Sequence, residues 1–555
     1  MPLDIRPDHL KIVEEILEKH LPDREVWAFG SRVNGTAKET SDLDLVVIGE
    51  NSLDFQTLGA LRDDFSESNL PYKVDLVDWA KIGETFREII RKDKIRINNR
   101  NLTNTHGGRG HNGGAWNKGA AGGWVTRSLG ELIEIKHGFA FKGEYFRNDP
   151  PGDILLTPGN FAIGGGFKTD KFKYYKGPVP EDFILQSNDM VVTMTDLSKE
   201  ADTLGYPAIV PLNNKSNHYL HNQRLGKIIV RDRESIDSGF LYYVMCSKKY
   251  RHEIIASATG TTVKHTSPER IKLFRFSLPP LPEQRAIAHI LGTLDDKIDL
   301  NRRMNETLEA MAQALFKSWF VDFNPVRAKM EGRPTGLPKE IEDFFPDSFE
   351  DSELGEIPRG WEVTVLGEII NILDSKRIPL SGKQRNERPG PYPYYGAAGI
   401  LDFIDDFIFE GIFILVGEDG SVINRNGNPV TQYVWGKFWV SNHAHVLSGN
   451  RGISNEHLLL FLQTLEIGPY VTGAVQPKLN QTNLCRIPFL LPNESICKSF
   501  EDIVSPIYAI YRENFMQIKI LTNIRDNLLP KLLSGEIKVS GIPPRQRSTG
   551  ERQAK

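Results

Sequence analysis

Three aspartates near the N-terminus have the spacing of a metal-dependent phosphate-transfer site. Asp42 and Asp44 stand two residues apart at the start of an apolar run, and alternation along a strand would put both side chains on one face. Asp75 lies in another strand-like run, residues 73–77. Carboxylate oxygens are ligands that Mg²⁺ prefers, and bound Mg²⁺ can bridge nucleotide phosphates and activate an attacking oxygen. The spacing therefore predicts a site for a divalent metal and a nucleotide.

A turn upstream of the aspartates has the composition of a phosphate-binding turn. Gly30 and Ser31 follow a strand-like segment, residues 26–29. Their backbone N–H groups and the Ser31 hydroxyl can donate to phosphate oxygens, and glycine permits a close approach of the ligand. A Gly-Ser dipeptide alone has no specificity. The succession G-S-R-x-x-G, then S-D-x-D, then a strand aspartate is a specific combination.

This combination resembles the small nucleotidyltransferases of the polymerase-β type, over residues 1–97. The resemblance implies a transferase that uses Mg²⁺ and a nucleoside triphosphate, with Gly30 and Ser31 binding the nucleotide. It assigns the catalytic and metal-binding roles to Asp42, Asp44 and Asp75. Two alternatives stay open from the residues alone. One is a solvated acidic turn, and the other is a competent fold whose activity is lost or regulatory.

The elements that must position these residues form a compact first domain. Apolar residues at helical spacing, followed by short β-branched runs, predict one helix and three strands. These elements are expected at residues 10–21, 26–29, 43–48 and 73–77. Residues 98–123 are rich in Gly and Asn and almost lack apolar side chains, so they are expected to be a flexible linker.

Two long stretches after the linker are copies of one another. Gly123-Trp124 and Gly360-Trp361 are each followed by a Leu-Gly-Glu sequence at the same distance. Thr259-Gly260 and Thr472-Gly473 open segments that match without a gap as far as a Leu-Pro pair. A chain with two copies of a globular unit can present two similar surfaces, as a symmetric dimer does. Duplex DNA is often read as two half-sites on one face, so the duplication favours a DNA reader.

A long helical pattern follows each copy. Seam positions recur in steps of four and three from Ile287 to Trp319 and from Ile496 to Leu528, a 3.5-residue repeat typical of a coiled coil. The second set includes Ile510 and Ile524. Asn305 and Asn514 stand at equivalent seam positions, where a buried Asn specifies register. The alternative is two amphipathic helices, each packed on its own domain.

The copies and their helices resemble the specificity subunit of type I restriction–modification enzymes, over residues 124–540. The segments that carry the resemblance are 138–142, 188–198, 222–226, 278–285, 392–396 and 529–535. It implies two target-recognition domains on double-stranded DNA, with two methyltransferase subunits and, for cleavage, restriction (translocase) subunits as partners. S-adenosylmethionine and ATP would be used only by those partners, and the specificity part would have no catalytic centre. The appended transferase departs from the usual pattern of this family.

The expected architecture is an α+β multidomain chain. A small α/β nucleotidyltransferase domain precedes two mixed, β-rich target-recognition domains separated by two long antiparallel coiled-coil helices. The expected boundaries are 1–97 for the transferase, 98–123 for the linker, 124–280 for the first recognition domain, 281–345 for the first helix and connector, 346–492 for the second recognition domain, 493–540 for the second helix and 541–555 for a disordered basic tail.

Polar and basic loops in both copies are the candidate DNA contacts. Base edges are read by Arg, Lys, Asn and Gln side chains, while phosphate contacts fix the register. The candidates are Asn222, Gln223, Arg224, Lys264 and His265 in the first copy, and Lys383, Arg385, Gln476, Lys478 and Asn480 in the second. Each could equally be a plain solvated loop residue. Because the copies differ at these loops, the two half-sites should differ in sequence.

Composition limits the remaining functions. A net charge of −4 neither indicates nor excludes nucleic-acid binding, because local patches create the binding field. Three cysteines without C-x-x-C spacing predict neither a thiolate metal site nor a disulfide framework, so a cytoplasmic location is expected. The N-terminus lacks a signal-peptide pattern and no apolar run could span a bilayer, so no membrane partner is expected.

Three functions fit these observations. The first is a DNA-specificity subunit with an appended nucleotidyltransferase. The second is a nucleotidyltransferase acting on protein or RNA, whose C-terminal part only targets it. The third is a structural adaptor that has lost both activities. Most of the chain belongs to the recognition part, which favours the first, and the filled positions Asp42, Asp44 and Asp75 argue against the third.

Overall fold

The structure, a computed structural model, describes most of the chain. The described residues are 3–34, 41–49, 74–82, 84–97, 123–169, 171–198, 200–212, 217–260, 263–473 and 476–539, with isolated positions between 53 and 72. The predicted linker, apart from Gly123, and the predicted tail lie outside them. The chain forms two compact units, Met1–Asp295 with Asn523–Lys555, and Asp296–Thr522.

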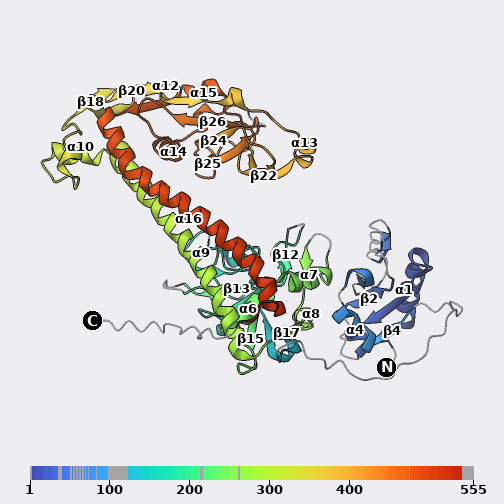
Figure 1. The fold of residues 1–555 in the computed structure, drawn as a ribbon. Helices are drawn as coiled ribbons and strands as arrows, with labels where there is room; N and C mark the ends of the chain where they lie inside the picture. The colour runs from blue at the N-terminus through green and yellow to red at the C-terminus, as the bar shows by residue number, and fades with distance from the viewer. Residues whose placement is uncertain are drawn as a thin grey trace, which may run out of the picture. The chain divides into compact units, whose positions relative to one another are not determined.

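A four-stranded sheet in the order β3-β2-β1-β4 forms the first domain (Figure 1). Its elements are α1 (Pro7–His20), β1 (Val26–Phe29), α2 (Ser31–Asn34), β2 (Leu43–Val47), β3 (Val74–Asp78), α4 (Glu84–Lys92) and β4 (Lys94–Arg96). Val13 and Leu17 of α1 pack on Leu45 at one face of the sheet, and Ile90 of α4 packs with Val46 at the other. The predicted helix and three strands are all present.

The first copy consists of small sheets with helices towards its end. Its strands are β5 (Val125–Ser128), β6 (Ile133–His137), β7 (Phe146–Arg147), β8 (Asp153–Leu155), β9 (Lys173–Tyr175), β10 (Ile184–Leu185), β11 (Met190–Thr193), β12 (Thr195–Asp196), β13 (Pro207–Ile209), β14 (Tyr219–Leu220), β15 (Leu225–Val230), β16 (Lys264–His265) and β17 (Arg275–Leu278). Its helices are α5 (Leu129–Leu132), α6 (Ser238–Cys246), α7 (Lys248–Ala256) and α8 (Pro268–Lys272). The sheet orders are β10-β14-β8-β9-β7, β13-β11-β15-β6, β12-β16 and β17-β5.

The second copy is built around a six-stranded sheet in the order β21-β26-β24-β25-β22-β23. Its strands are β20 (Glu362–Val365), β21 (Ile370–Ile372), β22 (Pro389–Tyr395), β23 (Ile400–Ile404), β24 (Phe409–Gly417), β25 (Thr431–Val440), β26 (Ala444–Gly449) and β27 (Pro488–Leu491). Its helices are α12 (Leu366–Ile369), α13 (Gly382–Asn386), α14 (Asn455–Thr464) and α15 (Gln481–Cys485). The connector before it holds α10 (Asn324–Met330), α11 (Lys339–Glu342) and the hairpin of β18 (Phe349–Ser352) and β19 (Gly355–Pro358).

Both copies are closed by the same contact between their first and last strands. β5 pairs antiparallel with β17, and β20 pairs antiparallel with β27. The backbone N–H of Leu129 donates to the Phe274 carbonyl at 2.9 Å, and that of Leu366 donates to the Ile487 carbonyl at 2.7 Å. The two copies predicted from the sequence therefore share this part of their fold, and a long helix follows each copy.

The two long helices are α9 (Leu281–Phe316), continued by a π-helical turn at Lys317–Val321, and α16 (Glu494–Ser534). They lie side by side and antiparallel (Figure 1), because Asn301 meets Gln517 at 3.1 Å while Asn305, further along α9, meets Asn514. The predicted seam positions of α9 are all buried or half-buried. The predicted coiled-coil pairing is therefore consistent with the packing of α9.

The predicted seam of α16 is wrong in part. Ile510 and Ile524 were placed on it, yet both side chains are exposed. Val504 and Tyr508 lie off the predicted seam and are buried, together with the seam residues Ile496, Phe500 and Asn514. Near Tyr508 the helix has a second packing partner, because the ring of Tyr508 lies 5.1 Å from the ring of Tyr433 in β25 of the second copy. The alternative of a helix packed on its own domain is correct for this stretch.

Candidate nucleotidyltransferase site and DNA-facing loops

The carboxylates of Asp44 and Asp75 are brought together by a parallel strand pair. β2 and β3 pair in parallel, and Asp44 and Asp75 are direct partners in the register. Side chains at paired positions of adjacent strands point to the same face. Asp75 is buried and Asp44 is half-buried, whereas Asp42 lies exposed just before β2. The structure thus places all three predicted aspartates at one end of β2, two of them in the sheet.

The surroundings of Asp44 disfavour its charged form. Burial, opposed by Arg270 and reinforced by Asp75 and Asp42, raises the pKa of the Asp44 carboxyl to about 6. A carboxylate that loses water and faces like charges is stabilised by a nearby cation. A cation beside Asp44 would therefore favour its ionised form.

Gly30 leaves the space that the Asp44 carboxylate fills. Its φ is +83°, and a Cβ at this position would lie 2.4 Å from Oδ2 of Asp44. Ser31 follows at once as the first residue of α2. The predicted phosphate-binding turn therefore lies directly over the acidic cluster, and only glycine allows that approach.

Arg32 is a positioning residue that the sequence analysis did not identify. Its side chain is buried, and its guanidinium donates to the Ser41 carbonyl at 2.7 and 2.9 Å and to the Asp4 carbonyl at 2.9 Å. It also stacks 3.8 Å above the ring of Tyr72. Arg32 thereby fixes the backbone that leads into Asp42 and Asp44. The sequence feature that could have indicated this role is the arginine of the G-S-R segment, which has no Asp or Glu next to it in the sequence.

A guanidinium from the first copy also reaches the acidic cluster. Nη2 of Arg270, in α8, lies 3.1 Å from Oδ2 of Asp75 and 3.4 Å from Oδ1 of Asp44. The sequence analysis did not predict this contact, because nothing in the linear sequence connects residues so far apart.

The copies hold one of their candidate DNA loops in the same way. In the first copy Thr259 and His265 exchange backbone hydrogen bonds, and Thr266 N–H donates to the Met194 carbonyl at 3.0 Å. In the second copy the corresponding loop has the same exchange between Thr472 and Lys478. The predicted candidates at 264–265 and 476–480 therefore lie at equivalent positions of the two copies.

The second loop has an additional anchor, His445. Its Nε2 lies 2.7 Å from the Leu479 carbonyl, which can only accept, so this nitrogen carries a proton. Its Nδ1 lies 2.6 Å from Oδ2 of Asp374 and 3.8 Å from Glu418. Arg377 bonds the same two carboxylates, at 3.4 and 2.9 Å, so this largely shielded cluster is a network of polar contacts that holds the loop.

The other predicted DNA-contacting residues differ in whether their side chains are exposed or already buried or hydrogen-bonded within the protein. Asn222 is buried, and its Oδ1 accepts from the Arg224 N–H at 3.0 Å, so it shapes a turn. Arg385 donates to the Leu380 carbonyl at 2.7 Å, and Asn480 caps α15. Lys264 is half-buried. The remaining candidates have exposed side chains, and these are Gln223, Arg224, His265, Lys383, Gln476 and Lys478.

Comparison with known families decides what the duplicated part is. The profile of the type I restriction modification DNA specificity domain matches residues 121–310 and 358–518, more than half of the chain. The chain belongs to the type I restriction–modification specificity family. The profile of the nucleotidyltransferase domain matches residues 10–98, so this member of the family carries an appended nucleotidyltransferase domain.

Individual relatives agree with both assignments. This chain is 28% identical over 355 residues to the type I restriction enzyme MjaIX specificity subunit of Methanocaldococcus jannaschii, and the match covers 61% of this chain and 76% of that protein. It is 28% identical over 366 residues to the HindI specificity subunit of Haemophilus influenzae, covering 54% and 77%. The transferase domain is 54% identical over 101 residues to the probable protein adenylyltransferase MntA of Haemophilus influenzae, covering 18% of this chain and 89% of that one.

The family assignment fixes the coarse requirements of each part. A nucleotidyltransferase domain implies a nucleotide substrate and a divalent metal. A type I specificity domain implies recognition of DNA within a restriction–modification system. Among the described residues, no helix is both long enough and apolar enough to cross a membrane.

Proposed function

We propose that residues 124–540 read a bipartite DNA sequence, one half-site per copy, within a complex that contains two methyltransferase subunits. The support for two half-sites is the equivalence of the loops at 259–266 and 472–479, which differ in sequence while sharing their backbone pattern. Similar frames with different side chains present different hydrogen-bonding groups to base edges. A complex of this composition would act on DNA in the cytoplasm, with restriction subunits added for cleavage.

The support for methyltransferase binding is an exposed apolar surface on the helix pair. Within α9, three large apolar side chains share one face of the helix at spacings of four and seven residues, and two side chains on α16 share a face at a spacing of four. The exposed side chains are Leu300, Met304 and Met311 on α9 and Met516 and Ile520 on α16. Apolar stripes of this kind mark protein–protein contacts. We define these five residues as the helix stripe.

A charge placed in the helix stripe tests the methyltransferase proposal. The double variant Met304→Glu, Ile520→Glu should lose the co-expressed methyltransferase, whereas the wild-type chain should carry two copies by native mass spectrometry. Met330→Glu is the matched control, because Met330 is an exposed methionine on α10 rather than on the helix pair. Retention of both methyltransferase copies by the double variant would remove the helix stripe from the interface.

We infer that the N-terminal domain transfers AMP from ATP to a hydroxyl group of a protein. The transferase resembles a probable protein adenylyltransferase, and the acidic cluster beneath Gly30 suits the chemistry. The acceptor oxygen bonds to the α-phosphorus, the bond between the α- and β-phosphates breaks, and pyrophosphate leaves. The proton of the acceptor hydroxyl passes to a carboxylate of the cluster.

The residues at the site fit a divalent metal such as Mg²⁺. Asp44 and Asp75 are side by side, Asp42 adds charge, and the missing Cβ of Gly30 allows the turn to approach the Asp44 carboxylate closely. The three carboxylates would hold the metal, which when bound supplies positive charge to the phosphate oxygens. Gly30 and Ser31 would orient the triphosphate through backbone N–H groups and the hydroxyl. The runner-up is a transferase acting on RNA, or one that the recognition part merely targets.

Labelled ATP tests the transfer and its direction. With Mg²⁺, α-labelled ATP should label protein while γ-labelled ATP should not. Asp44→Asn and Asp75→Asn should each reduce labelling by about 10²-fold or more, because charge stabilisation is the main catalytic term. Asp23→Asn is the matched control, since Asp23 is an exposed aspartate of the same domain. Label in the RNA fraction would favour the runner-up, and full activity of Asp44→Asn would overturn the assignment.

A further inference from the structure

The guanidinium of Arg270 lies where a cation would sit between the two paired carboxylates. A single nitrogen, Nη2, is 3.1 Å from Oδ2 of Asp75 and 3.4 Å from Oδ1 of Asp44. The side chains of Arg270, Asp44 and Asp75 are 20%, 18% and 6% exposed, so the contact is shielded from water. Ion pairs with little exposure are screened less than surface pairs. This contact therefore neutralises part of the negative charge that a metal would otherwise compensate.

Arg270 is held in place by the first copy on its other side. It lies in α8, whose N-cap Ser267 accepts from the Arg270 N–H at 3.3 Å. Its Nη1 is 3.3 Å from Oγ1 of Thr259, the residue that opens the candidate DNA loop of the first copy. One side chain thus connects that loop to the acidic cluster of the transferase.

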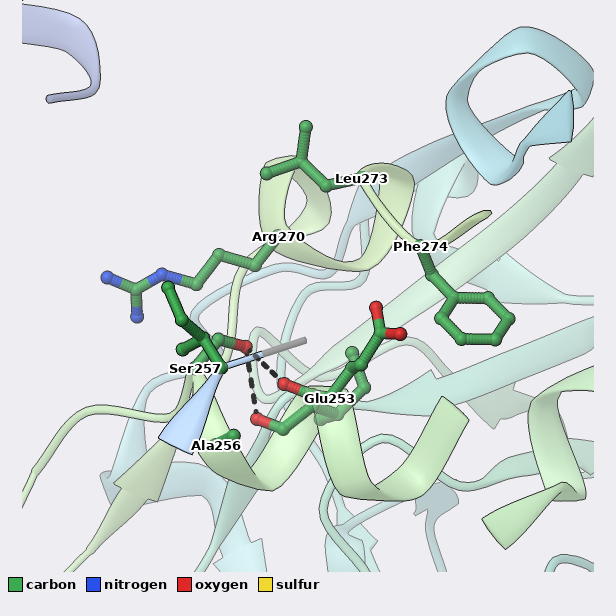
Figure 2. A pocket seen from close by; sticks show the side chains of 8 residues that line it. Glu253, Ala256, Ser257, Arg270, Leu273 and Phe274 are labelled. Atoms are coloured by element: carbon green, nitrogen blue, oxygen red, sulfur yellow. Dashed lines mark hydrogen bonds between the residues drawn. The ribbon is translucent and has the colours of Figure 1, made fainter. Parts of the chain in front are cut away.

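An apolar residue of the transferase domain lies near the ion pair. Figure 2 shows Arg270 extending from α8 beside a pocket that Glu253, Ser257 and Phe274 line, and Ile82 of the transferase domain contributes to the same lining. An apolar group of the transferase domain therefore faces the first copy in addition to the two carboxylates.

The second copy does not carry this arginine. The equivalent residue is Asn483, which follows its cap residue Asn480 as Arg270 follows Ser267. Asn483 donates from Nδ2 to the Tyr470 carbonyl at 3.0 Å and so serves the fold of its own copy. The shared fold therefore does not need a guanidinium at this position.

We propose that the first copy is an internal inhibitor of the transferase, with Arg270 taking the place of the metal between Asp44 and Asp75. The inhibitor and the metal exclude one another, because both need the same two carboxylate oxygens. Displacement of α8 opens the site, and the Thr259 contact gives the DNA loop a direct way to displace it. This inference rests on the proposed metal-dependent activity and adds its regulation.

Metal affinity of the full chain tests the inhibitor directly. Mn²⁺, followed by its electron paramagnetic resonance signal, reports binding without requiring an acceptor protein. Arg270→Ala should bind Mn²⁺ about tenfold or more tightly than the wild-type chain, a change of about 1.4 kcal/mol. Arg270→Gln should bind Mn²⁺ with similarly increased affinity. Because its amide can still donate to Thr259, this second variant controls for misfolding of the first. Arg275→Ala is the matched control, because Arg275 lies in β17 of the same copy.

The outcomes separate the inhibitor from the transferase assignment. Tighter binding in both Arg270 variants, lost again when Asp44→Asn is added, supports the inhibitor. Equal Mn²⁺ affinity in the wild type and both variants, with binding still abolished by Asp44→Asn, overturns the inhibitor and leaves the metal site standing. No Mn²⁺ binding to any of the chains overturns the metal role of the aspartates and the inhibitor with it.

Discussion

Asn514 donates a hydrogen bond from Nδ2 to Oδ1 of Asn305 at 2.9 Å, between two buried side chains on antiparallel helices. Asn305 in turn donates to the Tyr511 carbonyl at 3.1 Å. Both amides therefore have hydrogen-bond partners inside the seam, and the side-chain pairing depends on the relative position of α9 and α16. A buried Asn at a seam position fixes register at a cost in stability. The Asn305–Asn514 pair therefore sets the register of α9 against α16.

Replacing one asparagine of the pair should destabilise the helix pair more than replacing both, because a single replacement leaves the other amide without its hydrogen-bond partner. Asn305→Leu leaves the amide of Asn514 without this acceptor, which costs about 1–3 kcal/mol. The double variant Asn305→Leu, Asn514→Leu should be at least as stable as the wild type, because both polar groups are gone. Hydrogen exchange of the α9 and α16 amides measures this. Equal protection in the single variant and the wild type would mean that the pair has no role in register.

Lengthening both helices should lengthen the DNA spacer. Inserting one heptad in α9 and one in α16, next to the asparagine pair, keeps the seam and adds about 10 Å. That length corresponds to about three base pairs of B-DNA. Mapping of the methylated sequence should show the same half-sites with a longer gap. An unchanged gap would contradict a spacer role for the helices.

Gly30→Ala should abolish nucleotide transfer more severely than backbone strain alone explains. The new Cβ would lie 2.4 Å from Oδ2 of Asp44 and must displace that carboxylate. Gly123→Ala is the control for strain, since Gly123 has a similar φ of +81° and no atom within 4 Å of its added Cβ. Transfer of α-labelled ATP is the measurement. Full activity in Gly30→Ala would show that the turn does not press on the metal ligand.

His445→Gln should weaken the reading of one half-site only. A glutamine amide reproduces one of the two ring contacts and releases either the Leu479 carbonyl or Asp374. Binding to target DNA should weaken about tenfold, about 1.4 kcal/mol, with discrimination lost in the second half-site. His443→Gln is the control, because His443 lies just before the same strand and is exposed. Equal loss at both half-sites would mean that His445 does not act through the loop.

The sequence predicts the acidic cluster but does not predict the strand pairing that brings its carboxylates together. Alternation placed Asp42 and Asp44 on one face, whereas the parallel register that pairs Asp44 with Asp75 depends on a long crossover that has no local signature. The contacts of Arg270 with Asp44 and Asp75 could not be predicted for the same reason, since these residues lie far apart in the chain. The role of Arg32 depends on packing around Tyr72 that only the fold provides.

The duplication and the first helix were predictable because they rest on periodicity and repetition within the sequence. The seam of α16 is less predictable, because a heptad pattern does not show which other elements pack on the helix. The contact of Tyr508 with Tyr433 of β25 depends on the fold, and the predicted seam residues Ile510 and Ile524 are exposed. The DNA-facing residues remain predictions, since a loop that reads bases and a loop that is merely solvated have the same composition.

Each copy is proposed to read one half of a bipartite target, and exchanging one copy tests this most directly. Residues 124–280 are replaced by the same region of a relative with a known target, and the methylated sequence is mapped in cells that also carry the methyltransferase. The account predicts that one half-site changes to that of the donor while the other half-site and the gap stay the same. A change in both half-sites, or in neither, would contradict it.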